Sequence, residues 1–137
     1  MKKGFTLIEL LGVIAILGVI IAVAIPSLVE SNKQAKTNEK KDFENTLILA
    51  TKDYINYYGD DSICDGDETC INEANDLAKL YTEDGKTKEI STKTLIDKSF
   101  LKSSLVDPST NNKLANEVII ITVINENNTL KYEFDRR

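Results

Sequence analysis

The sequence predicts an α+β protein in which one long N-terminal helix packs on a small antiparallel sheet near the C-terminus. Three patterns carry this prediction: an apolar stretch near the start, an amphipathic stretch that follows it directly, and alternating apolar and charged residues at the end. The chain has 137 residues, of which 42% are hydrophobic and 28% charged, and this fits one modest domain with one special segment. A multidomain enzyme is not expected.

The first half of the helix, residues 5–29, is predicted to span a membrane. Its apolar run, Leu10–Val29, is interrupted only by Pro26 and Ser27, and about 20 such residues are enough for a helix to cross the hydrocarbon core. Pro26 has no amide proton and clashes with the carbonyl group of Ala22, so we expect it to weaken and kink the helix there.

Gly18 and Ala22 lie four residues apart within this run. Small residues at that spacing allow two membrane helices to approach closely. Glycine and alanine are also common in membrane helices that have no such contact, so both interpretations stay open.

The helix is predicted to continue as an amphipathic segment to about residue 58 and to pack on the sheet with its apolar stripe. Lysines occupy the other side, which we expect to face water. Gly59 follows and can adopt the left-handed conformation that ends many helices. The residues expected to face the sheet recur at helical spacing and are Ala35, Phe43, Leu47, Ala50, Tyr54 and Tyr57.

Residues 59–108 are predicted to form a loop with short helices near 72–81 and 92–102, separated by the charged turn around Gly85. A β-hairpin is predicted at 117–135, because β-branched residues precede a turn and apolar residues alternate with charged ones after it. Together with the amphipathic helix, these segments make residues 30–137 a globular head large enough to bury a modest core.

Composition and charge exclude several classes of function. Without Lys2, Lys3 and Glu9, the chain's 17 basic and 22 acidic residues become 15 and 21, a net charge of −6 from residue 30 onward. Such a charge opposes nucleic-acid binding, which needs clustered cations. The chain has no histidine and only two cysteines. We therefore predict no catalytic residues, no metal site and no cofactor.

Cys64 and Cys70 flank a short acidic loop that we expect to lie outside the membrane. A disulfide would persist there in oxidising surroundings, and Gly66 permits a tight loop; two reduced thiols are the alternative. A calcium loop is the other proposal, but its ligand order is absent and solvated turn acids explain the composition equally well. The acids concerned are Asp61, Asp65, Asp67 and Glu68.

Glu9 stands at the threshold of the apolar run, where a carboxylate needs an explanation. An acid costs about 3 kcal/mol at the centre of a membrane helix and less near its end. One alternative is a signal peptide cut after Ala24, which would release a secreted soluble binding domain. A second is a plain membrane anchor, with Glu9 reaching the lipid headgroups. A third comes from resemblance.

Residues 3–11, K-G-F-T-L-I-E-L-L, followed by Gly18 and by Ala24-Ile25-Pro26, resemble the N-terminus of type IV pilins and pseudopilins. The resemblance implies that residues 1–4 are a leader peptide, which a prepilin peptidase removes by cutting after Gly4. It also implies methylation of the new amine on Phe5.

The same resemblance gives Glu9 a role as the fifth residue of the mature chain. A charged amine in an apolar setting is tolerable only when it is paired. The carboxylate of Glu9 can pair with the amine of Phe5 in its own helix, or with that of a neighbouring subunit in a growing fibre. The second arrangement would select subunits at the correct axial position.

The resemblance implies a structural subunit and not an enzyme. We expect a single-pass protein of the cytoplasmic membrane that moves into a fibre on the cell surface. Its implied partners are copies of itself or related pilins, the prepilin peptidase, a membrane-embedded assembly platform and, before assembly, membrane lipid. The alternative within the family is a pseudopilin of a type II secretion or DNA-uptake machine.

Overall fold

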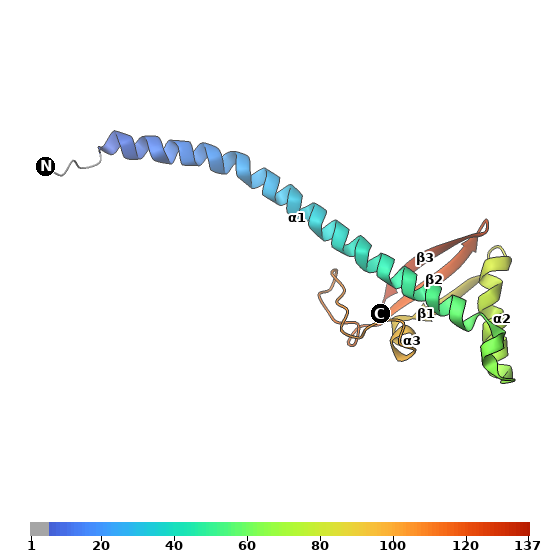
Figure 1. Cartoon of the computed structure of the whole chain (residues 1–137). Coiled ribbons are helices and arrows are strands. Elements are labelled where there is room, and N and C mark those ends of the chain that lie inside the picture. The colour runs from blue at the N-terminus through green and yellow to red at the C-terminus, as the bar shows by residue number, and fades with distance from the viewer. Residues whose placement is uncertain (1–5) are drawn as a thin grey trace. The chain divides into compact units, whose positions relative to one another are not determined.

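The structure is a computed structural model that describes residues 6–137. Contacts divide the chain into two compact units, one ending at Glu39 and one running from Lys40 to Arg137. The elements in chain order are α1 (Leu7–Tyr58), the short 3-10 helix η1 (Asp61–Cys64), α2 (Glu68–Thr82), β1 (Thr87–Ser91), α3 (Thr92–Asp97), β2 (Ile119–Glu126) and β3 (Thr129–Arg136) (Figure 1).

The long N-terminal helix is confirmed, because α1 is one helix of 52 residues. Pro26 lies inside it, and the hydroxyl group of Ser27 donates to the carbonyl oxygen of Ala24 over 3.0 Å. The residues around Ala22 are helical. The kink expected there stays a prediction.

The small antiparallel sheet is also confirmed and has three strands in the order β1-β2-β3. β2 is central: its Ile121 pairs with Ile90 of β1 and with Phe134 of β3. Every second residue of β2 is buried, as expected for a strand with one covered face. The C-terminal part of α1 crosses the sheet (Figure 1), so the arrangement is α+β.

The turn between β2 and β3 is made by two asparagines. Asn127 and Asn128 have φ values of 52° and 61°, the left-handed pair that a two-residue hairpin turn of this kind requires. The carboxylate of Asp84 accepts a hydrogen bond from the backbone N–H of Asn127 over 2.7 Å. The hairpin therefore lies where the sequence predicts it, with strands that begin and end slightly later.

The segment predicted to be a loop, 59–108, contains more regular structure than expected. It includes all of β1, in which Ile90 is the one large apolar residue and is 4% exposed. The second of the two short helices ends at Asp97, earlier than predicted. Its end is fixed by Ser99, whose φ is 67°, and by the backbone N–H of Phe100, which donates to the carbonyl oxygen of Leu95 over 2.8 Å.

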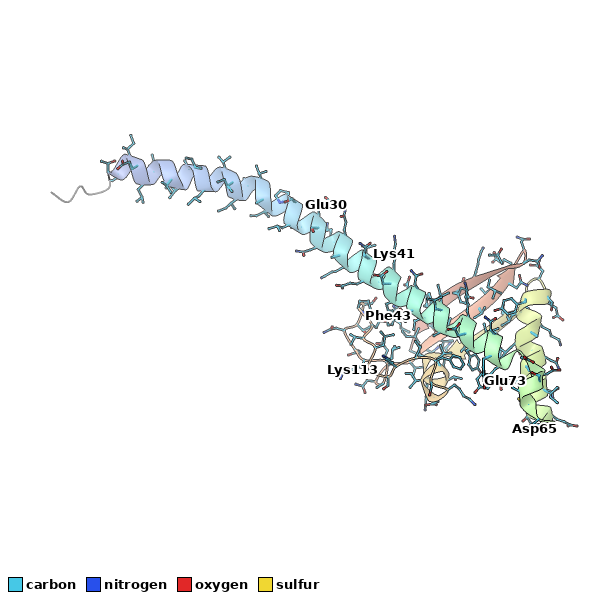
Figure 2. The ribbon with its side chains drawn as sticks, viewed as in Figure 1. Glu30, Lys41, Phe43, Asp65, Glu73 and Lys113 are labelled. Carbon is cyan, nitrogen blue, oxygen red and sulfur yellow. A yellow bond between two sulfur atoms is a disulfide. The ribbon has the colours of Figure 1, made fainter. Side chains whose placement is uncertain are left out.

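The covered face of α1 differs in part from the predicted stripe. Ala35 and Tyr57 are exposed, while Ile55 is 1% exposed. Ile55 is covered because α2 lies against its side of α1, where the hydroxyl group of Tyr81 donates to the Asn56 side chain over 2.9 Å. The predicted residues that are buried are Phe43, Leu47, Ala50 and Tyr54. Phe43 lies on the covered side and Lys41 on the exposed side (Figure 2).

Gly59 ends α1 for a reason other than the predicted one. Its φ is not among the positive values of the chain. Its N–H donates to the carbonyl oxygen of Ile55 over 2.7 Å, and a Cβ atom at this position would lie 2.5 Å from that oxygen. Glycine is required here by close approach and not by a left-handed backbone.

Candidate functional site

Glu9 caps the start of its own helix. The backbone N–H of Thr6 donates to Oε2 of Glu9 over 2.9 Å, and the Thr6 hydroxyl group donates to the same oxygen over 2.7 Å. Thr6 directly precedes the first residue of α1, and a Thr-x-x-Glu sequence is a known N-terminal capping pattern. This local role was missed in the sequence analysis, although the pattern T-L-I-E is visible there.

The other residues of the predicted processing site lie outside the described part of the chain. Gly4 and Phe5 are not described, so cleavage after Gly4, methylation of Phe5 and the pairing of the Phe5 amine with Glu9 all stay predictions. The structure adds that both Thr6 bonds use Oε2 of Glu9. A charged amine could approach Oε1 without breaking this cap.

The apolar half of α1 presents its side chains to the surroundings on all sides. Every large apolar side chain from Leu7 to Val29 is between 49% and 84% exposed. An 18-residue window of α1 has a mean hydropathy of 2.9 and no buried residue. Soluble single chains rarely expose an apolar surface of this extent. By length and composition this segment can cross a membrane.

The two glycines in the apolar half of α1, Gly12 and Gly18, face open space in the single chain. A Cβ atom built on Gly18 would meet nothing within 4 Å, and the same holds for Gly12. The single chain therefore offers no steric reason for a glycine at either position. Glycine in a helix interior costs about 1 kcal/mol relative to alanine. The close contact of Gly18 and Ala22 with another helix stays a prediction.

The two cysteines are joined in the structure. Cys64, at the end of η1, forms a disulfide with Cys70 of α2, and Cys64 is 5% exposed. The loop between them turns through Asp65 and Gly66, whose φ values of 44° and 84° are both left-handed. Asp65 lies at the tip of this loop (Figure 2). The predicted role of glycine in a tight loop agrees with this backbone.

One of the acids beside the disulfide, Asp67, serves as a helix cap. A carboxylate oxygen of Asp67 accepts hydrogen bonds from the backbone N–H groups of Thr69 and Cys70 over 2.8 Å and 3.4 Å, at the start of α2. The hydrogen bond from the Thr69 hydroxyl group and these two backbone bonds lower the pKa of Asp67 below its ordinary value. Across residues 6–137, no three metal-ligating side chains come together.

Two comparisons with known proteins found a similarity. Residues 1–25 match the family described as the prokaryotic N-terminal methylation motif. Over 54 residues the chain is 39% identical to the type IV major pilin protein PilA of Myxococcus xanthus (strain DK1622). This match covers 39% of the present chain and 24% of that relative, so it spans about a quarter of the curated protein's length.

No solved structure matches the chain at a significant level. The fold of the head is therefore described without reference to a solved structure. The methylation motif and the matching pilin confirm the resemblance to type IV pilins seen in the sequence.

Proposed function

We propose that this chain is a structural subunit that is processed after Gly4, held in the membrane by the apolar half of α1 and polymerised into a surface fibre. The observation that carries the proposal is the exposure of that half. A segment with a mean hydropathy of 2.9 and no buried residue needs an apolar partner along its whole length. Lipid provides one before assembly, and copies of the same helix provide one in a fibre.

Glu9 would set the position at which subunits dock. In a fibre core the amine of Phe5 would be surrounded by apolar side chains, where one charge without its partner costs about 3 to 5 kcal/mol. The carboxylate of Glu9 on a neighbouring subunit would remove this cost at one axial position only. The Thr6 bonds support the idea, because they hold the Glu9 side chain at the helix start through a single oxygen.

The proposed role is mechanical and not catalytic. It needs a prepilin peptidase to expose the Phe5 amine and a membrane-embedded platform to move the subunit from lipid into the fibre. The compact unit Lys40–Arg137, which makes up most of the head, would then form the surface of the fibre. A pseudopilin of a secretion or DNA-uptake machine would use the same N-terminal chemistry in a shorter fibre.

Two measurements on cells that express the chain test this proposal. Mass spectrometry should find a mature chain that begins at a methylated Phe5, and Gly4→Val should leave the full-length precursor in the membrane. Immunogold electron microscopy should then find the head on surface fibres that are absent without this chain. Short fibres found only with a secretion machine would favour the pseudopilin. A mature chain that begins at Ile25 would contradict the proposal and indicate a secreted domain.

A further inference from the structure

The last strand, β3, forms one border of the sheet. The strand order is β1-β2-β3, so β3 pairs with β2 on one side, and no other strand of the described chain lies on its other side (Figure 1). β3 is eight residues long, from Thr129 to Arg136. The unpaired N–H and C=O groups of such a border are a template for another strand. β3 therefore has a side that can pair with a strand of a second molecule.

The register of the sheet shows which backbone groups of β3 point outward. Asn125 of β2 uses its N–H and its C=O for hydrogen bonds with residues 85–86, on the side of β1. Its cross-strand partner, Leu130, is therefore not hydrogen-bonded to it. Hydrogen-bonded and non-bonded pairs alternate along an antiparallel ladder. The backbone groups that point away from β2 thus belong to Leu130, Tyr132 and Phe134.

The side chains of β3 alternate between the two faces of the sheet. Leu130, Tyr132 and Phe134 are partly buried against the core, while Lys131 and Glu133 between them are exposed. Charged residues on a border strand often prevent pairing with another strand. In β3, however, the two charges are opposite in sign and flank Tyr132 on either side. A second copy of the same strand can therefore match them.

One antiparallel register of two β3 strands satisfies both the backbone and the side chains. When Tyr132 lies opposite the Tyr132 of a second copy, Leu130 lies opposite Phe134 and Lys131 lies opposite Glu133. The two-fold symmetry makes each of these last two pairs occur twice. The outward backbone groups then form the hydrogen-bonded pairs. The two ion pairs fall at non-bonded positions, where side chains approach most closely.

Charge disfavours the neighbouring registers. A shift of two residues keeps the backbone groups in phase, but it places either the two Lys131 side chains or the two Glu133 side chains opposite each other, and such like charges are destabilising. Lys131 also pairs with Glu126 of its own hairpin, but an ammonium group has three donors and can bind both carboxylates. Within residues 6–137, Glu133 takes part in no ion pair.

We propose that β3 is a self-pairing edge, which joins the heads of two copies of this chain into one continuous sheet. The partner is thus a second copy, recognised by its own β3 in the register centred on Tyr132. Contacts of this size are weak for a single pair of molecules. Many of them, repeated along two assembled structures, would add up to a stable association.

The symmetry limits where this contact can form. Its two-fold axis is perpendicular to the sheet, so elements that lie along the sheet run in opposite directions in the two copies. These elements include the C-terminal part of α1, which crosses the sheet (Figure 1). In a fibre built by the axial docking proposed above, all subunits point the same way. On the basis of that proposed function, the contact joins the heads of two different fibres that lie antiparallel.

The test uses the full chain in lipid nanodiscs that hold one copy each. Analytical ultracentrifugation should show that the discs associate reversibly as the chain concentration rises to about 1 mM, the range of weak contacts. Discs that stay single throughout this range would overturn the proposal.

Charge reversal tests the register. Lys131→Glu and Glu133→Lys each place like charges opposite each other at both ion-pair positions, and each should weaken association at least about tenfold. An equimolar mixture of the two variants restores opposite charges at both positions and should associate about as the wild type does. A mixture that fails to associate, or single variants that associate like the wild type, would overturn the register.

Matched controls make the same charge changes outside β3. Lys113→Glu and Glu89→Lys alter exposed residues and should associate as the wild type does. Circular dichroism of each variant verifies that the head is folded. If the controls weaken association as much as the β3 variants do, net charge and not strand pairing governs it, and the proposal is wrong.

A disulfide provides a second readout for weak association. Cα atoms of a non-bonded antiparallel pair lie about 4.5 Å apart, within the range that a disulfide can bridge. A mixture of Lys131→Cys chains with Glu133→Cys chains should therefore form a disulfide-linked pair under mild oxidation, and either chain alone should form much less. The cysteines of the wild type are already joined to each other. Equal cross-linking in all three samples would contradict the register.

The outcome can be separated from that of the proposed function. Association between discs requires neither processing nor a fibre. Discs that stay single would overturn the self-pairing edge and leave the proposed fibre role in place. Failure of the mass-spectrometric test would remove the assignment to two fibres, but it would leave the pairing of β3 to be judged by the nanodisc measurement.

Discussion

Arg136, in the last strand, donates its Nε–H to the carboxylate of Asp107 over 2.6 Å. The Asp107 side chain is 0% exposed, and that of Arg136 is 27% exposed. The other carboxylate oxygen of Asp107 accepts from the backbone N–H of Ser109 over 2.7 Å. This ion pair ties the irregular segment before β2 to the end of β3.

Asp107→Asn should destabilise the head by about 2 to 3 kcal/mol. The substitution removes the charge that pairs with Arg136 and turns a donor toward another donor in one of its two orientations. The loss is expected below the range for fully buried pairs, because Arg136 is partly exposed. Urea unfolding of the full chain in detergent, followed by circular dichroism, measures it.

A matched control is available one residue before Arg136. Asp135 pairs with Arg137 over 2.8 Å, but both side chains are more than half exposed. Asp135→Asn should therefore change stability by less than about 0.5 kcal/mol. An equal loss of unfolding free energy in the two variants would mean that the burial of Asp107 does not contribute to stability.

The same ion pair predicts how stability depends on pH. Burial raises the pKa of Asp107, but the hydrogen bonds from Arg136 and Ser109 outweigh it and hold that pKa below its ordinary value. The folded state then resists protonation more than the unfolded state does, so this stabilisation is complete above about pH 4 and is lost as the pH falls through the folded pKa. Stability should fall less steeply below about pH 4 in Asp107→Asn than in the wild type.

The carboxylate of Asp76 also makes the folded state less stable as the pH falls. Hydrogen bonds from Lys86 and Lys88 lower the pKa of Asp76 to about 2, although this group is more exposed and screening weakens its effect. Asp107→Asn should thus keep part of the acid dependence. Identical slopes of unfolding free energy against pH in both proteins would contradict the role of Asp107.

The parts of the fold that could be predicted are those with a local period. The helical spacing of apolar residues in α1 and the alternation of apolar and polar residues in β2 and β3 involve residues close together in the chain. The sequence therefore displays them directly. β1 has no such signal, because its one large apolar residue, Ile90, becomes part of the core only by pairing with Ile121 on β2. A strand of this kind is defined by its partner and not by its own sequence.

The same distinction holds for the functional residues. The hydrogen bond from Thr6 to the capping carboxylate of Glu9 spans three positions. It could have been found from the Thr-x-x-Glu pattern. The pair of Asp107 and Arg136 is separated by 29 positions. No local pattern marks either residue.

Replacing Cys64 and Cys70 together by serine should lower the melting temperature of the head. The bridge closes a short loop, for which the chain-entropy model gives about 2 kcal/mol. Fibre assembly should persist, since the loop lies far along the chain from the apolar half of α1. Differential scanning calorimetry of the full chain measures the change.

Reduction supplies the control for the disulfide. The wild type with a thiol reductant should melt at the temperature of the double serine variant. If the oxidised wild type and the variant have the same melting temperature, the disulfide does not stabilise the head in solution.

Gly18→Leu should leave membrane insertion intact and reduce the incorporation of processed chain into fibres. A leucine side chain meets nothing in the single chain, so any loss must come from a contact between helices. Gly12→Leu is the matched control, because Gly12 is equally open and has no small residue four positions away. Quantifying the chain in sheared fibres and in membranes tests both. Equal incorporation of the two variants would remove the argument for a close contact at Gly18.

Glu9→Gln separates the two roles of Glu9. Glutamine also serves at this position of a capping pattern, so the Thr6 N–H should keep an acceptor and α1 should begin at the same residue. The charge that would pair with the Phe5 amine is lost, and an unpaired amine in a fibre core costs about 3 to 5 kcal/mol. We expect processed Glu9→Gln chain to accumulate in the membrane and to be depleted from sheared fibres.

Thr6→Val gives the converse change. It removes the hydroxyl donor to Glu9 and keeps both the backbone N–H donor and the charge. If pairing with the amine governs docking, Thr6→Val should enter fibres nearly as the wild type does, in cells that lack the wild-type chain. If capping governs docking, Thr6→Val should fail and Glu9→Gln should succeed. Normal incorporation of Glu9→Gln would therefore refute the pairing mechanism and leave the proposed fibre role in place, because we expect cleavage after Gly4 not to depend on the charge that the substitution removes.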